Sequence, residues 1–469
     1  MSQWWGRFAG HAAWGSNGFG FFNVYSRFTM SAYTRREFLE TSSAGLAGAG
    51  LSGAVSQESR SEASVPPSDR LRFGAIGING MGWTDTNALL GIDGVECTAL
   101  CDVDRNVLEK RAAELEEQTD TTPDLYEDYR RLLEDDALDF VVIGTPDHWH
   151  CLQMVHACQA GKDVYVEKPL GNSIAECDVM RRVAEKTGRV VQVGQWQRSS
   201  DHWQRAVEYL NSGAIGTVRH TKAWSYVGWK DRLPKKPNQE PPKGVDYDMW
   251  LGPAPERPFN PNRFHFTFRW YWDYAGGLMT DWGVHLIDYV LKGMNLDNPQ
   301  SVASMGGSFG YPKGGRETPD TQQALYRFGD VTMVWEHAVG ISNGPYNRGH
   351  GVAFIGNNGT LVIDRSGWEV IPEVEDGQYE TEALPPRDGE GGLDAHARNF
   401  VASIRGDETP NAPVDAAANT AVNAHLGNVA FRVGRDVAWN AENRRFVDDP
   451  EANDLVQPSY RGPWNLPTV

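Results

Sequence analysis

Cysteine is scarce in this chain, and the few cysteines do not form a metal-binding pattern. They are Cys97, Cys101, Cys151, Cys158 and Cys177. A zinc site typically uses closely spaced pairs that recur along the chain, and no such recurrence is found, so no metal is predicted. Their odd number also argues against a disulfide framework. We therefore expect buried, reduced thiols without a chemical role.

Basic residues are also in deficit. The chain has 44 Lys and Arg against 62 Asp and Glu, which gives a formal net charge of -18 at pH 7. A field of this sign repels phosphate backbones, so nucleic acid is not an expected partner. Apolar residues make up 40% and aromatic residues 11%, a composition typical of globular proteins. A length of 469 residues is enough for two domains, each with its own core.

The amino-terminal region lacks a long, strongly apolar run but carries a targeting pattern. Arg35 and Arg36 precede an uncharged stretch, 41–57, built mainly from Ala, Gly, Leu and Ser. This is the twin-arginine pattern. A permanent membrane helix needs about 20 strongly apolar residues, so no stable membrane insertion is predicted. We interpret residues 30–57 as a twin-arginine signal that sends the protein through the twin-arginine export machinery to a periplasmic or other extracytoplasmic location.

The segments on either side of this signal have different compositions. Residues 1–29 are rich in Gly, Trp and Phe without periodicity, and we interpret them as a non-native extension, with translation beginning at Met30. Residues 58–69 are largely Ser, Glu and Pro, a composition that cannot bury enough apolar surface to order itself. We predict a linker there.

A glycine-rich turn opens the first predicted domain, residues 70–195. The apolar strand 71–76 is followed by a turn and then by a helical run to Leu90. The turn contains Gly77, Asn79, Gly80, Met81 and Gly82. Such a turn lets a pyrophosphate approach the free N–H groups at the helix start. Asn79 replaces the second glycine of the dinucleotide pattern, but Asn tolerates left-handed backbone better than most residues.

An acidic residue follows the second predicted strand. Asp102 lies about 20 residues beyond the last glycine, where a carboxylate accepts hydrogen bonds from the ribose hydroxyls of a dinucleotide. It would repel a 2'-phosphate, so NAD is favoured over NADP, although Arg105 nearby could soften that repulsion. The alternative is that Asp102 only caps the next helix.

Two more apolar strands end in conspicuous motifs. The strand 139–144 leads into Thr145, Pro146 and, further on, His150, while the strand 163–166 leads into Glu167 and Lys168. Alternation of strands with helices predicts a doubly wound parallel sheet, the Rossmann arrangement of an α/β domain. Ligands bind beyond the carboxyl ends of such strands, which is where both motifs lie.

Aromatic residues and helically spaced polar residues mark the second predicted domain, 196–446. The region is rich in Trp, whose flat rings suit stacking on the C–H faces of sugars, although core packing explains most individual Trp residues better. Asp281 and His285 are four residues apart in an expected helix, and there a carboxylate could orient the imidazole. Helices expected over 394–404 and 415–434 would cover the back of a sheet. The tail, 447–469, would wrap the surface or pack on a neighbouring subunit.

These motifs and their order resemble those of the Gfo/Idh/MocA family of oxidoreductases. The resemblance covers about residues 70–446. It rests on the glycine turn, Thr145-Pro146 followed by His150, Glu167-Lys168-Pro169, and Gly276-Gly277 followed by Asp281 and His285. It implies that the second domain is an α+β domain with an open, mostly antiparallel sheet. It also implies a homo-oligomer formed through that sheet.

The resemblance assigns roles to the candidate site residues. Lys168 would lie beside the nicotinamide and the reacting hydroxyl, where an ammonium stabilises the developing alkoxide. His285 would accept the hydroxyl proton, with Asp281 holding it or the substrate. We expect Arg198, in the crossover segment, to contact substrate. The cofactor-binding residues would be Gly77, Asn79, Gly80, Met81, Gly82, Asp102, Thr145, Pro146, His150, Glu167 and Lys168.

The sequence therefore predicts an NAD-dependent oxidoreductase that transfers hydride between a hydroxyl of a sugar, polyol or glycoside and a tightly bound cofactor. One alternative is glycoside hydrolysis by transient oxidation. Another is a binding protein that has lost turnover. Coupled oxidation of one sugar and reduction of another on a cofactor that never leaves also fits export, because free NAD should be scarce outside the cytoplasm.

Overall fold

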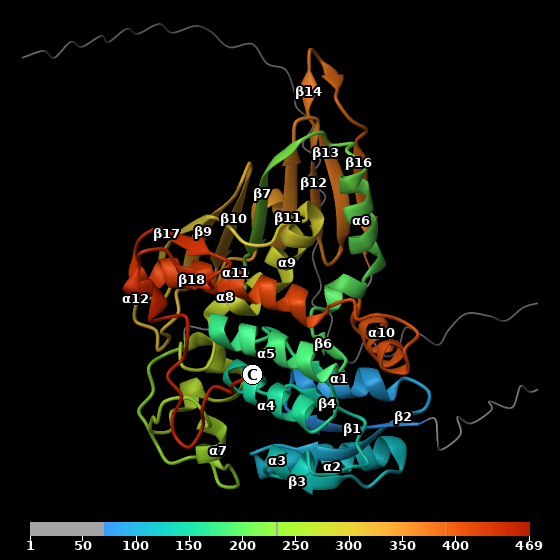
Figure 1. Cartoon of the computed structure of the whole chain (residues 1–469). Coiled ribbons are helices and arrows are strands. Elements are labelled where there is room, and N and C mark those ends of the chain that lie inside the picture. Colours follow the sequence, from blue (N-terminus) through green and yellow to red (C-terminus); the bar gives the residue numbers. More distant parts are fainter. Residues whose placement is uncertain (1–69, 231–232, 390) are drawn as a thin grey trace, which may run out of the picture. The chain divides into compact units, whose positions relative to one another are not determined.

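A six-stranded parallel sheet forms the first domain, with strand order β3-β2-β1-β4-β5-β6 (Figure 1). The computed structural model describes residues 70–230, 233–389 and 391–469, all within one compact unit of the chain. The strands are β1 (Leu71–Ile76), β2 (Val95–Cys101), β3 (Asp124–Tyr126), β4 (Phe140–Ile143), β5 (Asp163–Val166) and β6 (Val191–Val193). The twin-arginine segment, the extension before it and the linker 58–69 lie outside the described residues.

Helices connect these strands, as the alternating pattern predicts. They are α1 (Met81–Leu90), α2 (Arg105–Thr119), α3 (Tyr129–Leu132), α4 (Asp147–Gln159) and α5 (Ile174–Thr187). All four residues of β4 are buried, which explains the uninterrupted apolar run of this central strand. Helix α5 begins at the N-cap Ser173, whose hydroxyl accepts from Glu176 N, and ends at Gly188 in the left-handed conformation. The predicted doubly wound parallel sheet is confirmed.

A ten-stranded mixed sheet forms the second domain, in the order β16-β13-β12-β11-β7-β10-β9-β8-β17-β18. Its strands are β7 (Val218–Ser225), β8 (Ser301–Gly307), β9 (Thr321–Phe328), β10 (Val331–Ala338), β11 (His350–Gly356), β12 (Gly359–Asp364), β13 (Gly367–Pro372), β16 (Leu384–Asp388), β17 (Val437–Asn440) and β18 (Arg445–Phe446). Only β7 and β10 pair in parallel among these strands, and Figure 1 shows β7 inserted between later strands. The expected mostly antiparallel sheet is confirmed. A small separate hairpin joins β14 (Val374–Glu375) to β15 (Gln378–Tyr379).

The remaining helices are short or lie beside this sheet. They are η2 (Trp196–Ser199), α6 (Asp201–Asn211), α7 (Tyr247–Leu251), η3 (Pro261–Arg263), η4 (His265–Trp270), α8 (Gly277–Asp281), α9 (Gly283–Met294), η5 (Pro345–Asn347), α10 (Leu393–Arg405), α11 (Val414–Val433) and α12 (Pro450–Asn453). Helix α11 packs against α9 and β8 on one side and against α5 of the first domain on the other. It therefore ties the two sheets together. None of the helices in the described part of the chain has the length and apolar character needed to cross a bilayer.

The apolar spacing of helix α10 led us to expect that it covers the second sheet. It does not. Its Phe400 lies edge-on to Phe140 of β4, with ring centroids 5.3 Å apart, and to Tyr165 of β5 at 5.6 Å. The helix thus packs on the parallel sheet of the first domain. An amphipathic pattern shows which face of a helix is buried but not which surface buries it.

The tail also returns to the first domain of its own chain. Val456 accepts a backbone hydrogen bond from Ala175 N at 3.0 Å, and Trp464 packs edge-on against Trp149 with centroids 4.9 Å apart. This segment therefore packs on the surface of its own chain. The five cysteines are all buried and free, as expected.

Candidate active site

A cavity of about 690 Å³ lies at the carboxyl ends of the parallel strands and is also lined by residues of the second domain. Eleven of the fourteen residues expected at the site line it, namely Gly77, Asn79, Gly80, Met81, Asp102, Thr145, Pro146, Glu167, Lys168, Asp281 and His285. Gly82, His150 and Arg198 do not. Residues 113 positions apart in the sequence, such as Lys168 and Asp281, meet here.

The glycine turn has the backbone geometry of a phosphate-binding loop. Gly77 and Gly80 have φ of 77° and 72°, values that favour glycine, and a Cβ on Gly80 would meet nothing within 4 Å. Helix α1 starts at Met81 without a side-chain cap from any described residue, so its first N–H groups remain available to an anion. These residues fit the pyrophosphate of a dinucleotide.

Gly82 acts through packing and not through contact with the cavity. A Cβ at this position would lie 2.1 Å from the carbonyl oxygen of Gly77 and 3.1 Å from Cα of Gly144. Only glycine therefore lets α1 approach the ends of β1 and β4 this closely. His150 is likewise fully buried, with its ring nitrogens 2.7 Å from Pro169 O and 2.9 Å from Thr145 O. It connects the loop that contains Thr145 to the loop that contains Pro169.

Asp102 lines the cavity and also holds the glycine turn. Its Oδ2 accepts from Ile78 N at 3.1 Å, and its Oδ1 accepts from Asp104 N at 2.9 Å. The residue that caps α2 is Asp104, so capping does not explain Asp102. Burial raises the pKa of Asp102 to about 6. Arg105, the residue that could have softened its preference for NAD, forms an ion pair with Glu127.

A buried group of charges occupies the part of the cavity where the two domains meet. The ammonium of Lys168 lies 2.7 Å from Oδ1 of Asp281, and Arg269 Nε donates to Oδ2 at 3.0 Å. Burial opposes the ionisation of Asp281, but the charges of Arg269 and Lys168 prevail and hold its pKa well below the usual value. Asp281 is therefore a permanent carboxylate that fixes both cations.

His285 faces the same space without a hydrogen bond to its Nδ1 from any described residue. The side chain is only 5% exposed, and the rings of Trp196 and Trp282 lie 6.2 Å and 6.4 Å away. Burial, together with the charges of Lys168 and Arg365, holds the pKa of His285 well below its ordinary value. The imidazole is therefore neutral, so that one of its ring nitrogens is unprotonated and can accept a proton.

Asp281 does not orient this imidazole in the way the spacing suggested. The expected helix is interrupted at Trp282, so that Asp281 ends α8 and His285 lies in the first turn of α9. The oxygens of Asp281 are directed to Lys168 and Arg269, as described above. Those of Asp288, three residues after His285 in α9, are directed to Arg198 and Thr420.

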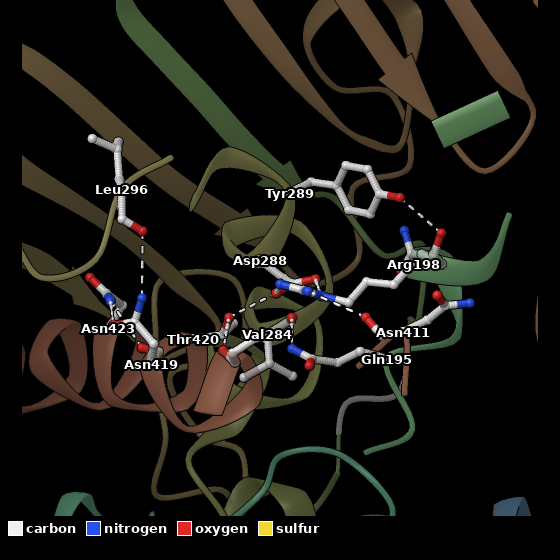
Figure 2. A network of polar contacts seen from close by, with 12 residues as sticks. Gln195, Arg198, Val284, Asp288, Tyr289, Leu296, Asn411, Asn419, Thr420 and Asn423 are labelled. Carbon is white, nitrogen blue, oxygen red and sulfur yellow. Dashed lines mark hydrogen bonds and ion pairs between the residues drawn. The ribbon is translucent and has the colours of Figure 1, made fainter. Parts of the chain in front are cut away.

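Arg198 belongs to a buried polar network (Figure 2). It does not line the cavity. Its Nε and Nη2 donate to the two carboxylate oxygens of Asp288 at 2.7 Å and 2.6 Å. Thr420 Oγ1 donates to the same carboxylate at 2.9 Å, which links η2 and α9 to α11. Gln195 Nε2 donates to Val284 O at 3.0 Å. The network anchors the turn of α9 that carries His285, and the structure does not bring Arg198 to the cavity as expected.

Sequence reasoning missed several residues that line the cavity. They are Asp147, Trp196, Arg269, Trp282 and Arg365 among others. Burial raises the pKa of Asp147 to about 8, so this carboxyl is largely protonated at neutral pH. The position of Asp147 directly after Thr145-Pro146 could have indicated that it lines the site. Arg269 and Arg365 lie in a 3-10 helix and at a hairpin tip, where no periodicity or motif singles them out.

Two family models match the chain. A model described as an oxidoreductase family, NAD-binding Rossmann fold, matches residues 71–195. A second, described as an oxidoreductase family, C-terminal alpha/beta domain, matches residues 215–466, more than half of the chain. The chain belongs to the Gfo/Idh/MocA oxidoreductase family. Membership gives it a nicotinamide-dinucleotide domain of the Rossmann type and confirms the resemblance drawn from the motifs.

Solved structures of similar fold include sugar-related oxidoreductases. An aldose-aldose oxidoreductase from Caulobacter crescentus, complexed with glycerol, is 19% identical with a TM-score of 0.60, covering 79% of this chain and 100% of that one. The WlbA dehydrogenase from Bordetella pertussis, in complex with NADH and UDP-GlcNAcA, is 16% identical with a TM-score of 0.59, covering 79% and 99%. At these identities the likeness establishes the fold of this Gfo/Idh/MocA protein.

Curated relatives match over a shorter region. A glycosyl hydrolase family 109 protein from Shewanella putrefaciens is 28% identical over 163 residues, which is 34% of this chain and 36% of the relative. Another from Shewanella baltica is 26% identical over 206 residues, 40% of this chain and 45% of the relative. The chain thus spans less than half the length of these curated relatives.

Proposed function

We propose that this protein is an NAD-dependent oxidoreductase that transfers hydride between a hydroxyl-bearing carbon of a sugar, polyol or glycoside and a tightly bound nicotinamide cofactor. The observation that carries the proposal is the meeting of Lys168 and His285 in one cavity with the glycine turn. An ammonium held by Asp281 and a neutral imidazole face the same space. The fold supplies a dinucleotide site beside them.

The cofactor would be held by groups of the first domain. The uncapped start of α1 and the glycine turn would bind the pyrophosphate, and Asp102 would accept from the ribose hydroxyls and so favour NAD. When bound, the nicotinamide supplies the carbon that takes up or returns hydride. Asn79, whose Nδ2 lies 3.1 Å from Nδ1 of His265, would border the same site.

In the oxidation direction, the C–H and O–H bonds of the substrate break and a C=O bond forms. With the cofactor bound, it would take up the hydride, and the hydroxyl proton would pass to the imidazole of His285. The ammonium of Lys168 stabilises negative charge on the oxygen as hydride leaves. Because the pKa of His285 is held low, the imidazole is unprotonated at neutral pH and ready to accept this proton. Asp281 fixes the ammonium and does not itself transfer the proton.

The direct test is a panel of sugars, polyols and glycosides added to purified protein with its bound cofactor. Oxidation of a substrate converts the cofactor to its reduced form, which absorbs in the near ultraviolet. We expect at least one carbohydrate to change this absorbance, and a deuterium on the oxidised carbon to appear in the cofactor. Reduction of the cofactor without transfer of that deuterium would contradict direct hydride transfer.

A second candidate is redox-neutral cleavage of a glycosidic bond. It is favoured by the match to glycosyl hydrolase family 109 proteins, and it would use the same hydride transfer in both directions. It predicts that an aryl glycoside releases its phenol only when NAD is present, with no net change of cofactor. Coupled oxidation of one sugar and reduction of another would instead give two sugar products and no phenol.

We also propose that the protein is exported with its cofactor already bound. The arginine pair Arg35-Arg36 supports this, because twin-arginine transport carries folded proteins. Fractionation of cells that express the full chain tests it. Wild-type protein should be found outside the cytoplasm, and replacement of both arginines by lysine should retain it inside; equal distribution of both would contradict export.

A further inference from the structure

Arg365 is a cation in the cavity that none of the catalytic groups neutralises. It lies at the tip of the hairpin that joins β12 to β13 and lines the cavity together with His285. Its Nε is buried without a hydrogen-bond partner, and within the described ranges no ion pair or hydrogen bond involves this residue. Burial lowers the pKa of Arg365 to about 10, which still leaves the guanidinium charged at neutral pH.

Two indole rings hold the guanidinium in place. Its Cζ lies 4.5 Å from the ring centroid of Trp196 and 4.5 Å from that of Trp282. The same two rings flank His285, so Arg365 and the expected proton acceptor share one aromatic enclosure. Cation–π contacts with desolvated rings stabilise a guanidinium but leave its N–H donors unsatisfied.

The hairpin that carries Arg365 is itself fixed. Oδ1 of Asp364 accepts from the backbone N–H groups of Ser366 and Gly367 at 2.8 Å and 3.1 Å, and it pairs with Arg348 at 2.8 Å. Gly367 has φ of 144°, and a Cβ there would collide with the carbonyl of Arg387. The guanidinium is therefore presented by a rigid turn and not by a freely moving side chain.

The charges at this end of the cavity do not balance. Lys168, Arg269 and Arg365 contribute three cations, and the one strongly ionised carboxylate, Asp281, is already bonded to the first two. Three further acidic side chains of the cavity, Asp102, Asp104 and Glu127, directly follow β2 or β3, and Asp102 bonds to the glycine turn. A partly buried guanidinium without an anion is costly.

Two further carboxyl groups face the same space but do not restore the balance. Burial raises the pKa of Asp147 to about 8 and that of Glu167 to about 7, so at neutral pH the former is largely protonated and the latter about half ionised. The net charge around His285 is therefore positive, although the chain as a whole carries -18. This local excess requires a separate explanation.

From this geometry we infer that Arg365 is a specificity-determining residue that binds a carboxylate of the substrate, so that the preferred substrate is a sugar acid such as a uronic or aldonic acid. The inference rests on the proposed function and names its substrate class. A carboxylate would accept two parallel N–H bonds from the guanidinium fork and complete its desolvated surroundings. The planar anion also needs less room beside two indoles than a tetrahedral phosphate does.

Binding measured by calorimetry on the full-length protein with its cofactor tests this without turnover. The probes are glucuronate, galacturonate and gluconate, each compared with glucose, galactose and glucitol, and a sugar phosphate as a separate arm. We expect at least one acid to bind more than tenfold more tightly than its uncharged counterpart. Arg365→Met should reduce this ratio to near one, and Arg365→Lys should retain part of it.

Arg387→Met is the matched control, because Arg387 also lies over an indole, that of Trp368, at 5.2 Å, but outside the cavity. It should leave the ratio unchanged. Equal binding of acids and uncharged sugars, an unchanged ratio in a folded Arg365→Met protein, or a preference for the sugar phosphate would overturn the inference.

Tight, Arg365-dependent binding of an acid without any cofactor reduction would support the subsite and contradict the proposed hydride transfer. Reduction of the cofactor by uncharged sugars alone would support the proposed hydride transfer and contradict the carboxylate subsite.

Discussion

The Nζ of Lys168 lies 2.7 Å from Oδ1 of Asp281, although one residue follows the fifth strand of the first domain and the other ends a helix of the second. The contact joins the two domains at the charged group of the cavity. Because Arg269 bonds to the second oxygen of Asp281 and the two cations hold the pKa of this carboxyl well below its usual value, the carboxylate is a poor base. Its role is to hold the ammonium where charge develops in the reaction.

Replacement of Lys168 by alanine should abolish most turnover without unfolding the protein. We expect kcat to fall by about 10²–10⁴-fold, because the oxygen of the substrate loses its cation. Asp281 keeps Arg269 as a partner, so cofactor content should stay near that of wild type. Lys222→Ala removes a comparable ion pair, with Glu336 at 3.1 Å, outside the cavity and should leave kcat intact. Normal turnover in Lys168→Ala would remove its assigned role.

Replacement of His285 by alanine should lower kcat by a similar factor, about 10²–10⁴-fold, since no group accepts the hydroxyl proton. Because its pKa lies well below 6.5, His285 should remain neutral, and kcat should show no histidine ionisation between pH 6 and 8. Because the folded state disfavours the protonated imidazole, the contribution of His285 to the free energy of unfolding is fully present above pH 6.5. It decreases as the pH falls below 6.5. His220→Ala, in a strand outside the cavity, serves as control. A loss of wild-type kcat centred near pH 6.5 would contradict the neutral imidazole.

Asp102 should make cofactor binding depend on pH. Its folded-state pKa is about 6, above the ordinary 3.8, so ionisation costs the cofactor-free protein stability as the pH rises from 3.8 through 6. Ribose hydroxyls donate to the ionised form. NAD affinity should therefore increase as the pH rises through 6 and then level off. Asp102→Asn should flatten this dependence and reduce the preference for NAD over NADP. If the affinity of the wild-type protein for NAD does not change from pH 5 to 7, Asp102 does not contact the ribose.

Gly82→Ala should disrupt the glycine turn more than its small size suggests. The added Cβ would lie 2.1 Å from the carbonyl oxygen of Gly77, which forces α1 away from β1. We expect a loss of about 3 kcal/mol in the free energy of unfolding and at least tenfold weaker NAD binding. Gly161→Ala, at φ of 78° in open space, should cost about 1 kcal/mol and leave NAD binding unchanged. Equal effects of both variants, measured by denaturant unfolding and calorimetry, would contradict the close approach.

Arg198→Met distinguishes a structural role from a substrate contact. The variant leaves the carboxylate of Asp288, only 1% exposed, without its main partner, and we expect a loss of about 3–5 kcal/mol in unfolding free energy. KM of the folded protein should change by less than about threefold, because Arg198 does not line the cavity. Arg435→Met, which removes an exposed pair with Asp449, should alter stability little. A large rise in KM with unchanged stability would instead indicate the substrate contact expected from sequence.

The sequence predicted most of the fold because its signals are local. Buried parallel strands are uninterrupted apolar runs, and the strands of the second sheet alternate with period two, so both can be recognised within short windows. The packing partner of a helix is not local. Helix α10 shows this, because its apolar face is filled by Phe140 and Tyr165 of the other domain.

The site was predicted where its residues stand in contiguous motifs, as with Thr145-Pro146 and Glu167-Lys168. Residues that only the fold brings to the cavity, such as Arg269 and Arg365, were not predicted. Arg198 illustrates the opposite case. Its place after a strand end suggested a ligand, but a buried carboxylate 90 residues away competes for the guanidinium.

The identity of any small molecule released when the purified, full-length protein is denatured tests the central claim most directly. Mass spectrometry of the released material should find NAD or its reduced form at close to one molecule per chain, and Gly82→Ala should contain less. If nothing is released from the wild-type protein and added NAD does not bind to it, the oxidoreductase proposal is contradicted and a binding protein without turnover becomes the better account.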